Sequence, residues 1–348
     1  MSLYLGVDVG SVSTDFAVID DNINVVAQAY LPTAGAPIKA IQKGLKLIRE
    51  ELGEVQFKSI GATGSGRYLA SVVLGADIVK NEITAHAVSA LHFVPGVQTV
   101  IEIGGQDSKI IILRDGIPVD FAMNTVCAAG TGSFLDHQAA RLGIQIEQFS
   151  ELALKSKNPT RIAGRCTVFA ESDMVHKQQI GHNIEDIIAG LCYSLVRNYL
   201  ANVAKGKEIL PEVVFQGGVA ANKGMQRAFE DILGMPVIVP KYHKIMGAIG
   251  AAILAKEYSF SNGKQSHFKG FDVIESEFKP SSFICHDCPN ECEIIELMEN
   301  GDIIARWGSI CGKWDITEPY AEVAELVDAA DSKSAALRGM RVRVPPSA

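Results

Sequence analysis

Apolar and polar residues alternate in short runs over the first thirty residues, and polar turns separate these runs. The pattern is typical of antiparallel strands joined by hairpins, so we expect three strands over 1–30. Longer amphipathic runs predict helices over 39–52 and 82–92, with a strand over 56–63 and a loop over 64–67 between them. These elements together predict one α/β lobe.

A similar order of elements begins again near residue 99. The second set comprises strands over 100–103, 110–114, 117–123 and 212–216, and helices after Gly130 and over 184–203 and 246–256. The last helix is rich in Ala and Gly, a composition that allows close packing at a hinge or between lobes. The weak repeat predicts an α/β fold built from two duplicated lobes.

Changes in composition divide the chain further. A Pro-Gly turn near 95–98 and a polar stretch that begins at Ser259 mark the boundaries. We expect a first lobe over 1–95 with a returning helix over 245–258, a second lobe over 96–244, a linker over 259–271, a cysteine-rich segment over 272–315 and a tail over 316–348. The tail carries no core pattern and turns basic, so we expect it to be disordered and outside the fold.

Two hairpins have the composition of phosphate-binding turns, in which backbone N–H groups face an anion. In the first, Asp8 ends an apolar strand, and the turn and hydroxyl residues are Gly10, Ser11, Ser13 and Thr14. The second unit spans 99–113 and has Gly104 and Gly105 at its turn. A single hairpin of this kind is also common in ordinary sheets. Two of them predict ATP in a cleft between two similar lobes.

A third glycine-rich turn follows the apolar strand over 212–216. Gly217, Gly218 and Asn222 lie between this strand and a predicted helix. Without a Cβ the backbone can approach a flat ring closely, which suits an adenosine pocket, although such turns also join strands to helices in many folds. Its place after two phosphate hairpins favours the nucleotide interpretation.

Composition limits the class of protein. The 348 residues are 47% hydrophobic with a mean hydropathy of +0.16, enough for two cores and a short appendage. The net charge of −8 argues against nucleic acid as a partner, and no apolar run approaches the roughly 18 residues of a membrane span. The seven cysteines fit metal ligation in a reducing compartment better than a disulfide framework, so we expect a cytoplasmic protein.

Five segments in order resemble one known family. They are LGVDVGS, IEIGGQDSK, NTVCAAGTGSFLD at 124–136, GRCTVFAESDM at 164–174 and FQGGVAANKGM at 215–225. Over about residues 3–256 the chain resembles the acetate and sugar kinase, heat-shock chaperone and actin superfamily. Within that superfamily it is most similar to the activators of 2-hydroxyacyl-CoA dehydratases and the ATPase subunits of benzoyl-CoA reductase.

The resemblance implies two ribonuclease H-like lobes around an interlobe ATP cleft. It also implies a homodimeric ATPase with one [4Fe–4S] cluster between the subunits, ligated by Cys127 and Cys166 of each. Such a protein takes an electron from a ferredoxin or flavodoxin and passes it to a partner dehydratase or reductase.

The residues support this ligand set. A cubane needs four thiolates, and the body of the chain offers Cys127, Cys166 and Cys192. Two chains related by a two-fold axis supply four from the same pair. Cys127 and Cys166 precede predicted helices, whose N-termini favour anionic ligands, whereas Cys192 lies within an apolar helix and is expected in the core. The alternative is that Cys127 and Cys166 are both small buried residues.

Roles in ATP hydrolysis follow from residue type. Asp8 and Glu102 end the first strands of the two lobes, where a carboxylate can orient Mg²⁺ through water. Gln106 can position the attacking water and Lys109 can contact phosphate, unless both belong to a solvated hairpin turn. A further phosphate-facing turn is expected at Gly130, Thr131 and Gly132. It would connect the nucleotide to Cys127.

Glu82 and His86 lie four residues apart on a predicted helix. They either meet the cleft or form a surface pair.

Four further cysteines cluster near the C-terminus, with the spacing C-x2-C-x3-C and a distant fourth member. They are Cys285, Cys288, Cys292 and Cys311. Four thiolates at such spacing can bind Zn²⁺ or a second iron–sulfur cluster, or they remain free. The resemblance implies a similar segment in longer relatives of the activators.

Two other functions fit parts of the sequence. A sugar or acyl kinase of the same superfamily would use Glu82 or Asp107 as the base that activates a hydroxyl group. A non-enzymatic, metal-bearing regulatory or assembly module would bind ATP only as a conformational ligand.

Overall fold

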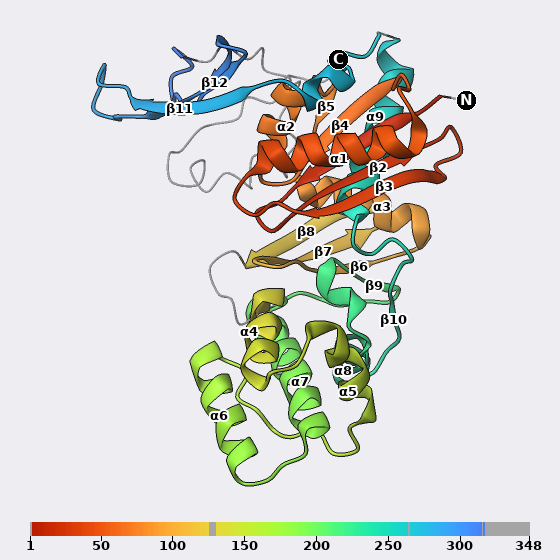
Figure 1. Ribbon diagram of the computed structural model, residues 1–348. Helices are drawn as coiled ribbons and strands as arrows, with labels where there is room; N and C mark the ends of the chain where they lie inside the picture. The colour runs from red at the N-terminus through yellow and green to blue at the C-terminus, as the bar shows by residue number, and fades with distance from the viewer. Residues whose placement is uncertain (1, 125–129, 264, 315, 317–348) are drawn as a thin grey trace.

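The computed structural model describes residues 2–124, 130–263, 265–314 and 316. They form a mixed α/β fold with two five-stranded sheets and one three-stranded sheet, as predicted from the repeat (Figure 1). Cys127 and residues 317–348 lie outside the described residues. Within the described part of the chain, no helix combines the length and apolar character that crossing a bilayer requires.

The first sheet has the strand order β3-β2-β1-β4-β5. Its strands are β1 (Tyr4–Val9), β2 (Ser13–Ile19), β3 (Val25–Pro32), β4 (Ser59–Thr63) and β5 (Ile78–Val79). The first three are antiparallel, whereas β4 and β5 continue the sheet in parallel with β1. Alternate side chains of β1 face opposite layers: Leu5 and Val7 pack under α1 (Pro37–Leu52) and α2 (Arg67–Leu74), and Tyr4 packs toward α9 (Met246–Asn262).

The second sheet repeats this topology in the order β10-β9-β6-β7-β8. Its strands are β6 (Thr99–Ile103), β7 (Ser108–Arg114), β8 (Ile117–Asn124), β9 (Val213–Gln216) and β10 (Val237–Ile238). As in the first sheet, the opening strands are antiparallel and a later strand, β9, adds in parallel beside β6. The shared strand order supports the predicted duplication.

Helices cover both faces of the second sheet. One face packs against α3 (Glu82–Phe93), which lies between the two sheets. The other face packs on a helical layer at the far end of the molecule, away from the first sheet (Figure 1). This layer comprises α4 (Gly132–Leu142), α5 (Ile146–Lys155), α6 (Thr167–Gln179), α7 (Ile184–Asn202) and α8 (Lys223–Leu233).

Glycines let α9 lie directly on the first sheet, as the Ala- and Gly-rich composition predicts. A Cβ at Gly6 of β1 would lie 1.8 Å from the carbonyl oxygen of Ala248, and one at Gly61 of β4 would lie 2.2 Å from that of Ala251. On its other side, Gly250 meets the backbone of Ala85 in α3 in the same way. The helix therefore joins the first sheet to the element that separates the two lobes.

We expect Gly6→Ala to lower the free energy of unfolding by about 3 kcal/mol or more, because the neighbouring atoms are backbone and cannot rotate away. Gly234→Ala is the matched comparison. Gly234 ends α8 in the left-handed helical region, with a φ of 66°, and no atom of the described residues lies within 4 Å of a built Cβ, so we expect a loss of only about 1 kcal/mol. Denaturant titrations of both variants measure the difference, and equal losses would contradict close packing at Gly6.

The segment after α9 differs from the expected linker. The helix continues to Asn262, and Phe268 and Phe271 then pack on Phe57 with ring centroids 5.2 and 6.1 Å away. Buried Asp77 accepts hydrogen bonds from the Ser266 hydroxyl and from the backbone N–H of His267. These contacts dock the segment on the first lobe. They were not predicted, because the composition of the segment is mainly polar.

The cysteine-rich segment follows as a short helical turn, η3 (Phe271–Ile274), and a small antiparallel sheet. Its strands are β11 (Phe278–Ile284), β12 (Glu293–Glu299) and β13 (Asp302–Trp307). Leu297 and Ala305 of this sheet are fully buried in the core of the first lobe. The amide of Gln42 in α1 donates to the carbonyl oxygens of Val273 and Ser276 and adds a polar contact.

Candidate functional site

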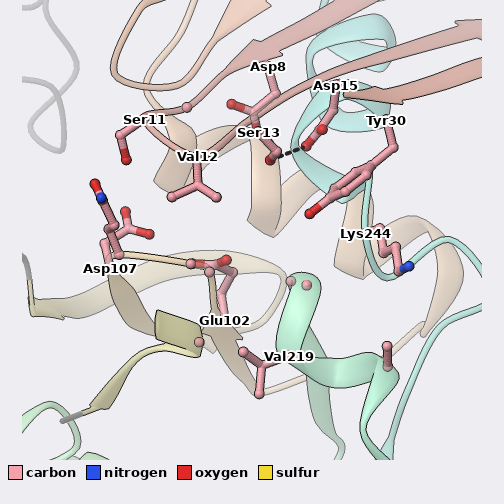
Figure 2. A pocket seen from close by; sticks show the side chains of 18 of the residues that line it. Asp8, Ser11, Val12, Ser13, Asp15, Tyr30, Glu102, Asp107, Val219 and Lys244 are labelled. Atoms are coloured by element: carbon pink, nitrogen blue, oxygen red, sulfur yellow. Dashed lines mark hydrogen bonds between the residues drawn. The ribbon is translucent and has the colours of Figure 1, made fainter. Parts of the chain in front are cut away.

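A cavity of about 550 Å³ opens between the two sheets, where the sequence predicts the nucleotide cleft. Figure 2 shows Asp8, Ser13 and Asp15 on one wall and Glu102 and Val219 on the opposite wall. Most of the predicted nucleotide residues line it: Asp8, Gly10, Ser11, Ser13, Glu102, Gly104, Gly105, Gln106, Lys109, Gly132, Gly217, Gly218 and Asn222. The structure thus brings the three glycine-rich turns together around one cavity.

Thr14, Gly130 and Thr131 do not line the cavity. The hydroxyl of Thr14 is 2.9 Å from that of Thr33 in the interior. Successive side chains of a strand point to opposite faces, so Ser13 reaches the cleft and Thr14 turns away from it. Thr131 is the N-cap residue of α4, and Gly130 lies beside the amide of Asn198.

The two phosphate hairpins touch at their tips. A Cβ at Gly105 would lie 2.8 Å from the side chain of Val12, so the second hairpin needs a glycine there. The same hairpin accepts hydrogen bonds at the carbonyl oxygens of Gly104 and Gly105 from the N–H groups of Gly132 and Ser133, both at 2.9 Å. Because these donors begin α4, a movement of the hairpin is passed directly to that helix.

Asp8 is enclosed at the end of β1. A Cβ at Gly64 would lie 2.3 Å from one of its carboxylate oxygens, and a Cβ at Gly247, at the start of α9, would lie 1.9 Å from the other. Burial and the neighbouring carboxylate of Glu82 raise the pKa of Asp8 to about 7. A buried carboxylate whose proton is readily displaced suits a divalent cation and its waters.

Glu102 and Lys109 form a buried ion pair on the opposite wall. The Lys109 ammonium lies 3.1 Å from Glu102 Oε2 and 2.6 Å from Asp107 Oδ2. Burial raises the pKa of Glu102 to about 7, although Lys109 opposes the shift. For Lys109, burial lowers the pKa, but Glu102 and then Asp107 outweigh it and raise it overall. Lys109 therefore keeps its charge at the cleft wall, where its contact with phosphate stays a prediction.

Glu82 and His86 both line the cavity and do not form a surface pair. His86 Nδ1 is 2.9 Å from the amide nitrogen of Gln216, which can only donate, so the ring nitrogen accepts. Burial and the charge of Lys109 lower the pKa of His86 to about 3. It is therefore neutral at physiological pH and holds Gln216 in place. Arg67 lies 3.6 Å from the buried carboxylate of Glu82.

Several lining residues were not predicted from the sequence, among them Asp15, Tyr30, Asp136 and Lys244. Asp15 is buried directly opposite Asp8 in the β1–β2 ladder. Burial and then the charge of Asp8 raise its pKa well above the usual range. The period-two alternation from Ser13 would have placed Asp15 on the cleft side. Tyr30 and Lys244 come from segments far apart in sequence, and the ammonium lies 5.5 Å from the ring centroid.

These carboxylates fit a magnesium ion held mainly by water and phosphate. Among the described residues, no group of three or more His, Cys, Asp or Glu side chains has the geometry of a metal site. One oxygen of buried Asp15 lacks a hydrogen-bond partner within the same part of the chain. Mg²⁺ usually takes one or two carboxylates and keeps several waters, so Asp8 and Asp15 suffice together with a nucleotide.

We expect the affinity for Mg²⁺ with ADP to rise with pH up to about 7 and then level off. Below its raised pKa of about 7 Asp8 is protonated, and metal binding must displace that proton, so affinity falls about tenfold per pH unit. Calorimetry at pH 6 and pH 8 measures this change. Asp8→Asn is the control, because it removes the effect of this carboxylate and leaves the titration of the nucleotide and of Asp15. An equal pH dependence in both proteins would contradict the assignment.

Cys166 is half-buried and occupies the N-cap position of α6, as the sequence predicts. The N-terminus of this 13-residue helix presents free N–H groups and favours a thiolate. Thiolate chemistry and this position fit a cluster ligand. The second predicted ligand, Cys127, lies outside the described residues. Cys192 is fully buried in α7, and burial raises its pKa to about 12, so it belongs to the core as predicted.

The C-terminal cysteines gather at one end of the small sheet. The N–H of Cys285 donates to the carbonyl oxygen of Cys292 at 2.8 Å, and the indole N–H of Trp314 lies 3.2 Å from Cys285 Sγ. Cys288 and Cys311 are exposed in the adjoining loops. The described side chains include no preformed group of metal ligands, so metal binding by these cysteines stays a prediction.

Comparison with known proteins agrees with this geometry. Residues 5–255 match the BadF/BadG/BcrA/BcrD ATPase family. The chain belongs to this family. It is 36% identical over 259 residues to the (R)-2-hydroxyglutaryl-CoA dehydratase activating ATPase of Acidaminococcus fermentans. This match covers 73% of this chain and 98% of that protein. Residues of the cleft and of the Cys166 helix thus lie within the matched range.

Two further relatives extend the comparison of this family member. An uncharacterized protein of Methanocaldococcus jannaschii is 33% identical over 266 residues, covering 75% of this chain but only 64% of that longer protein. Among solved structures, the activator of the 2-hydroxyisocaproyl-CoA dehydratase from Clostridium difficile with bound ADPNP superposes with a TM-score of 0.69 at 30% identity. That match covers 75% of this chain and 97% of the other.

Proposed function

We propose that this protein is an ATP-hydrolysing activator that delivers a low-potential electron to a 2-hydroxyacyl-CoA dehydratase or a related reductase. The observation that carries the proposal is the match to a named dehydratase-activating ATPase over 98% of that protein's length. The cleft between duplicated lobes supports ATP as the nucleotide, and one of the superposing activators holds ADPNP. A sugar or acyl kinase has no comparable support.

The proposed ATPase centre lies between the facing hairpins. Asp8, with Asp15 opposite, would hold Mg²⁺ and its waters, while the turn at Gly10–Ser11 and the one at Gly104–Gly105 offer N–H groups to phosphates. Gln106, exposed at the tip of the second hairpin, would position the attacking water. The turn at Gly217–Gly218 would face the adenosine.

The electron would be carried by a [4Fe–4S] cluster shared across a homodimer, with Cys127 and Cys166 from each chain as ligands. When bound, such a cluster supplies one-electron chemistry at low potential. Val168 and Phe169, next to Cys166, are 66% and 65% exposed, which supports a second copy of the chain as their cover. Exposed Arg161 and Arg165 nearby suit an acidic electron donor such as a ferredoxin or flavodoxin.

Nucleotide exchange would change the angle between the lobes. The α4 N-terminus follows the second hairpin, because its N–H groups bind the carbonyl oxygens of Gly104 and Gly105. Shifting a one-electron potential by about 200 mV requires roughly 4.6 kcal/mol, an amount that ATP binding and hydrolysis can supply.

The odd number of cysteines and the proposed cluster favour a reducing compartment, the cytoplasm.

Anaerobic purification tests the proposal against its alternatives. We expect a brown protein that turns over ATP without a sugar or acyl substrate. A colourless protein that releases ADP only with such a substrate would instead be a kinase. A protein that binds ATP without hydrolysing it would be a regulatory or assembly module.

We further propose that Cys285, Cys288, Cys292 and Cys311 bind a thiophilic metal, either Zn²⁺ or a second iron–sulfur cluster. The support is their spacing and their common position at one end of the β11–β13 sheet. We expect Cys288→Ser to remove one metal site per chain, measured by elemental analysis, while Ser282→Ala in the preceding strand keeps it. Equal metal content in the two variants would mean that these thiols are free.

A further inference from the structure

Three side chains on one face of α7 hold the loop that leads to Cys166. The Arg197 guanidinium donates to the carbonyl oxygen of Ile162 at 2.9 Å, and the Ser194 hydroxyl donates to that of Ala163 at 2.5 Å. The Asn198 amide donates to Gly164 at 2.7 Å and to Arg165 at 3.3 Å. Four consecutive carbonyl groups before the cysteine are therefore bound, which fixes a segment that has no regular secondary structure.

The same face of α7 is shaped for this loop. A Cβ at Gly190 would lie 2.1 Å from the carbonyl oxygen of Thr160, so only glycine allows the loop to approach. From the other side, the carboxylate of Asp173 in α6 accepts the N–H of Ala163 at 2.9 Å. The position of Cys166 is thus set by α7 as well as by its own helix.

Tyr199, which follows Asn198 in α7, contacts the backbone of strand β7, which forms part of the cleft wall. The hydroxyl of fully buried Tyr199 donates to the carbonyl oxygen of Lys109 at 2.7 Å. Lys109 lines the cavity and pairs with Glu102 and Asp107. Asn198 and Tyr199 therefore connect the Cys166 loop and the cleft wall through two adjacent residues of one rigid helix.

Asn198 also lies beside Gly130, directly before the N-cap residue of α4. A Cβ at Gly130 would lie 3.1 Å from Asn198 Oδ1 and 3.7 Å from the hydroxyl of Ser108, the first residue of β7. Asn198 is 2% exposed, and its Oδ1 has no hydrogen-bond partner among the described residues. A buried amide oxygen normally has one.

We propose that Asn198 and Tyr199 are positioning residues that couple the nucleotide cleft to Cys166. The Tyr199 hydroxyl senses the position of β7 beside the nucleotide, and the Asn198 amide transmits it to the carbonyl groups before the thiol. This coupling rests on the proposed electron-delivery function but concerns thiol geometry, which can be measured without a cluster.

The test is the alkylation rate of Cys166 in the full-length chain after iron removal, followed by mass spectrometry of its peptide. In the wild type we expect this rate to differ about threefold to tenfold between ADP and ADPNP, the change produced by altering one hydrogen bond. Tyr199→Phe removes only the hydroxyl, and we expect it to abolish the difference. Asn198→Asp keeps the shape but loses the donors, and we expect it to raise the rate with both nucleotides.

Asn202→Ala is the matched control, because among the described residues the Asn202 amide donates a single hydrogen bond, to the carbonyl oxygen of Asn198 within the same helix. It should keep the nucleotide difference of the wild type. A purely structural role for Tyr199 would change thermal stability but not the ratio of the two rates. If Asn198→Asp does not fold, the ratio of the two alkylation rates in Tyr199→Phe alone tests the coupling.

Two outcomes overturn the proposal: no difference between nucleotides in the wild type, or an undiminished difference in Tyr199→Phe. Its failure is distinguishable from failure of the proposed function. A wild-type protein that holds iron and delivers electrons with ATP, but shows no nucleotide effect at Cys166, contradicts the coupling alone. Absence of iron after anaerobic purification contradicts the proposed function and leaves the alkylation result valid.

Discussion

Replacing Asp8 by Asn is expected to lower the rate of ATP hydrolysis about a hundredfold or more, because a correctly held metal ion contributes several kcal/mol to phosphoryl transfer. Asp8 lies at the end of β1 with both carboxylate oxygens enclosed, one near Gly64 and one near Gly247. The amide keeps the shape of the side chain and removes its charge. A coupled-enzyme assay of ADP release at saturating Mg²⁺ measures the effect.

Asp115→Asn is the control for this change. Asp115 is exposed at the turn between β7 and β8, where its φ of 52° also suits asparagine. We expect unchanged ATP turnover in this variant. A loss of less than about tenfold in Asp8→Asn would mean that another group holds the metal.

Replacing Cys166 by Ser is expected to remove the bound iron and the brown colour, because each chain would then offer one thiolate instead of two to a shared cubane. The substitution removes one sulfur atom at the N-cap of α6 and adds a hydroxyl group, which is itself a good cap. The helix should therefore persist. Iron and sulfide assays, with the absorbance near 400 nm, measure the loss.

Cys192→Ala separates ligand loss from loss of a buried thiol. Cys192 is fully buried in α7, so the variant should lose about 1 kcal/mol of stability but keep its iron. Retention of iron in Cys166→Ser, or its loss in Cys192→Ala, would contradict the ligand assignment.

Much of the fold follows from local patterns. The hairpins around Gly10 and around Gly104–Gly105 repeat one another, and the two sheets share one strand order. The docking of the segment after α9 could not be predicted from local patterns, because Phe268 and Phe271 pack on Phe57, about two hundred residues earlier in the chain. Helices α2 and α5 are short and were not predicted.

The glycine-rich turns of the cleft were predictable, because their composition is itself the signal. Side chains within a strand were harder to place, because the alternation of the strand determines which of them face the cleft. Thr14 was therefore wrongly placed in the cleft, and Asp15 was not predicted there. The ion pair of Lys109 with Glu102 joins neighbouring strands and follows from register, since the two residues are paired in the β6–β7 ladder. Tyr30 and Lys244 come together only through the tertiary fold, and no local pattern indicates them.

The most direct test of the account is electron delivery under nucleotide control. The anaerobically purified protein is reduced, freed of reductant and mixed rapidly with an oxidised 2-hydroxyacyl-CoA dehydratase and either ATP or ADP. We predict that its visible absorbance returns to that of the oxidised protein only with ATP and the dehydratase together. Equal rates with ATP and ADP, or a protein without any reducible chromophore, would contradict the central claim.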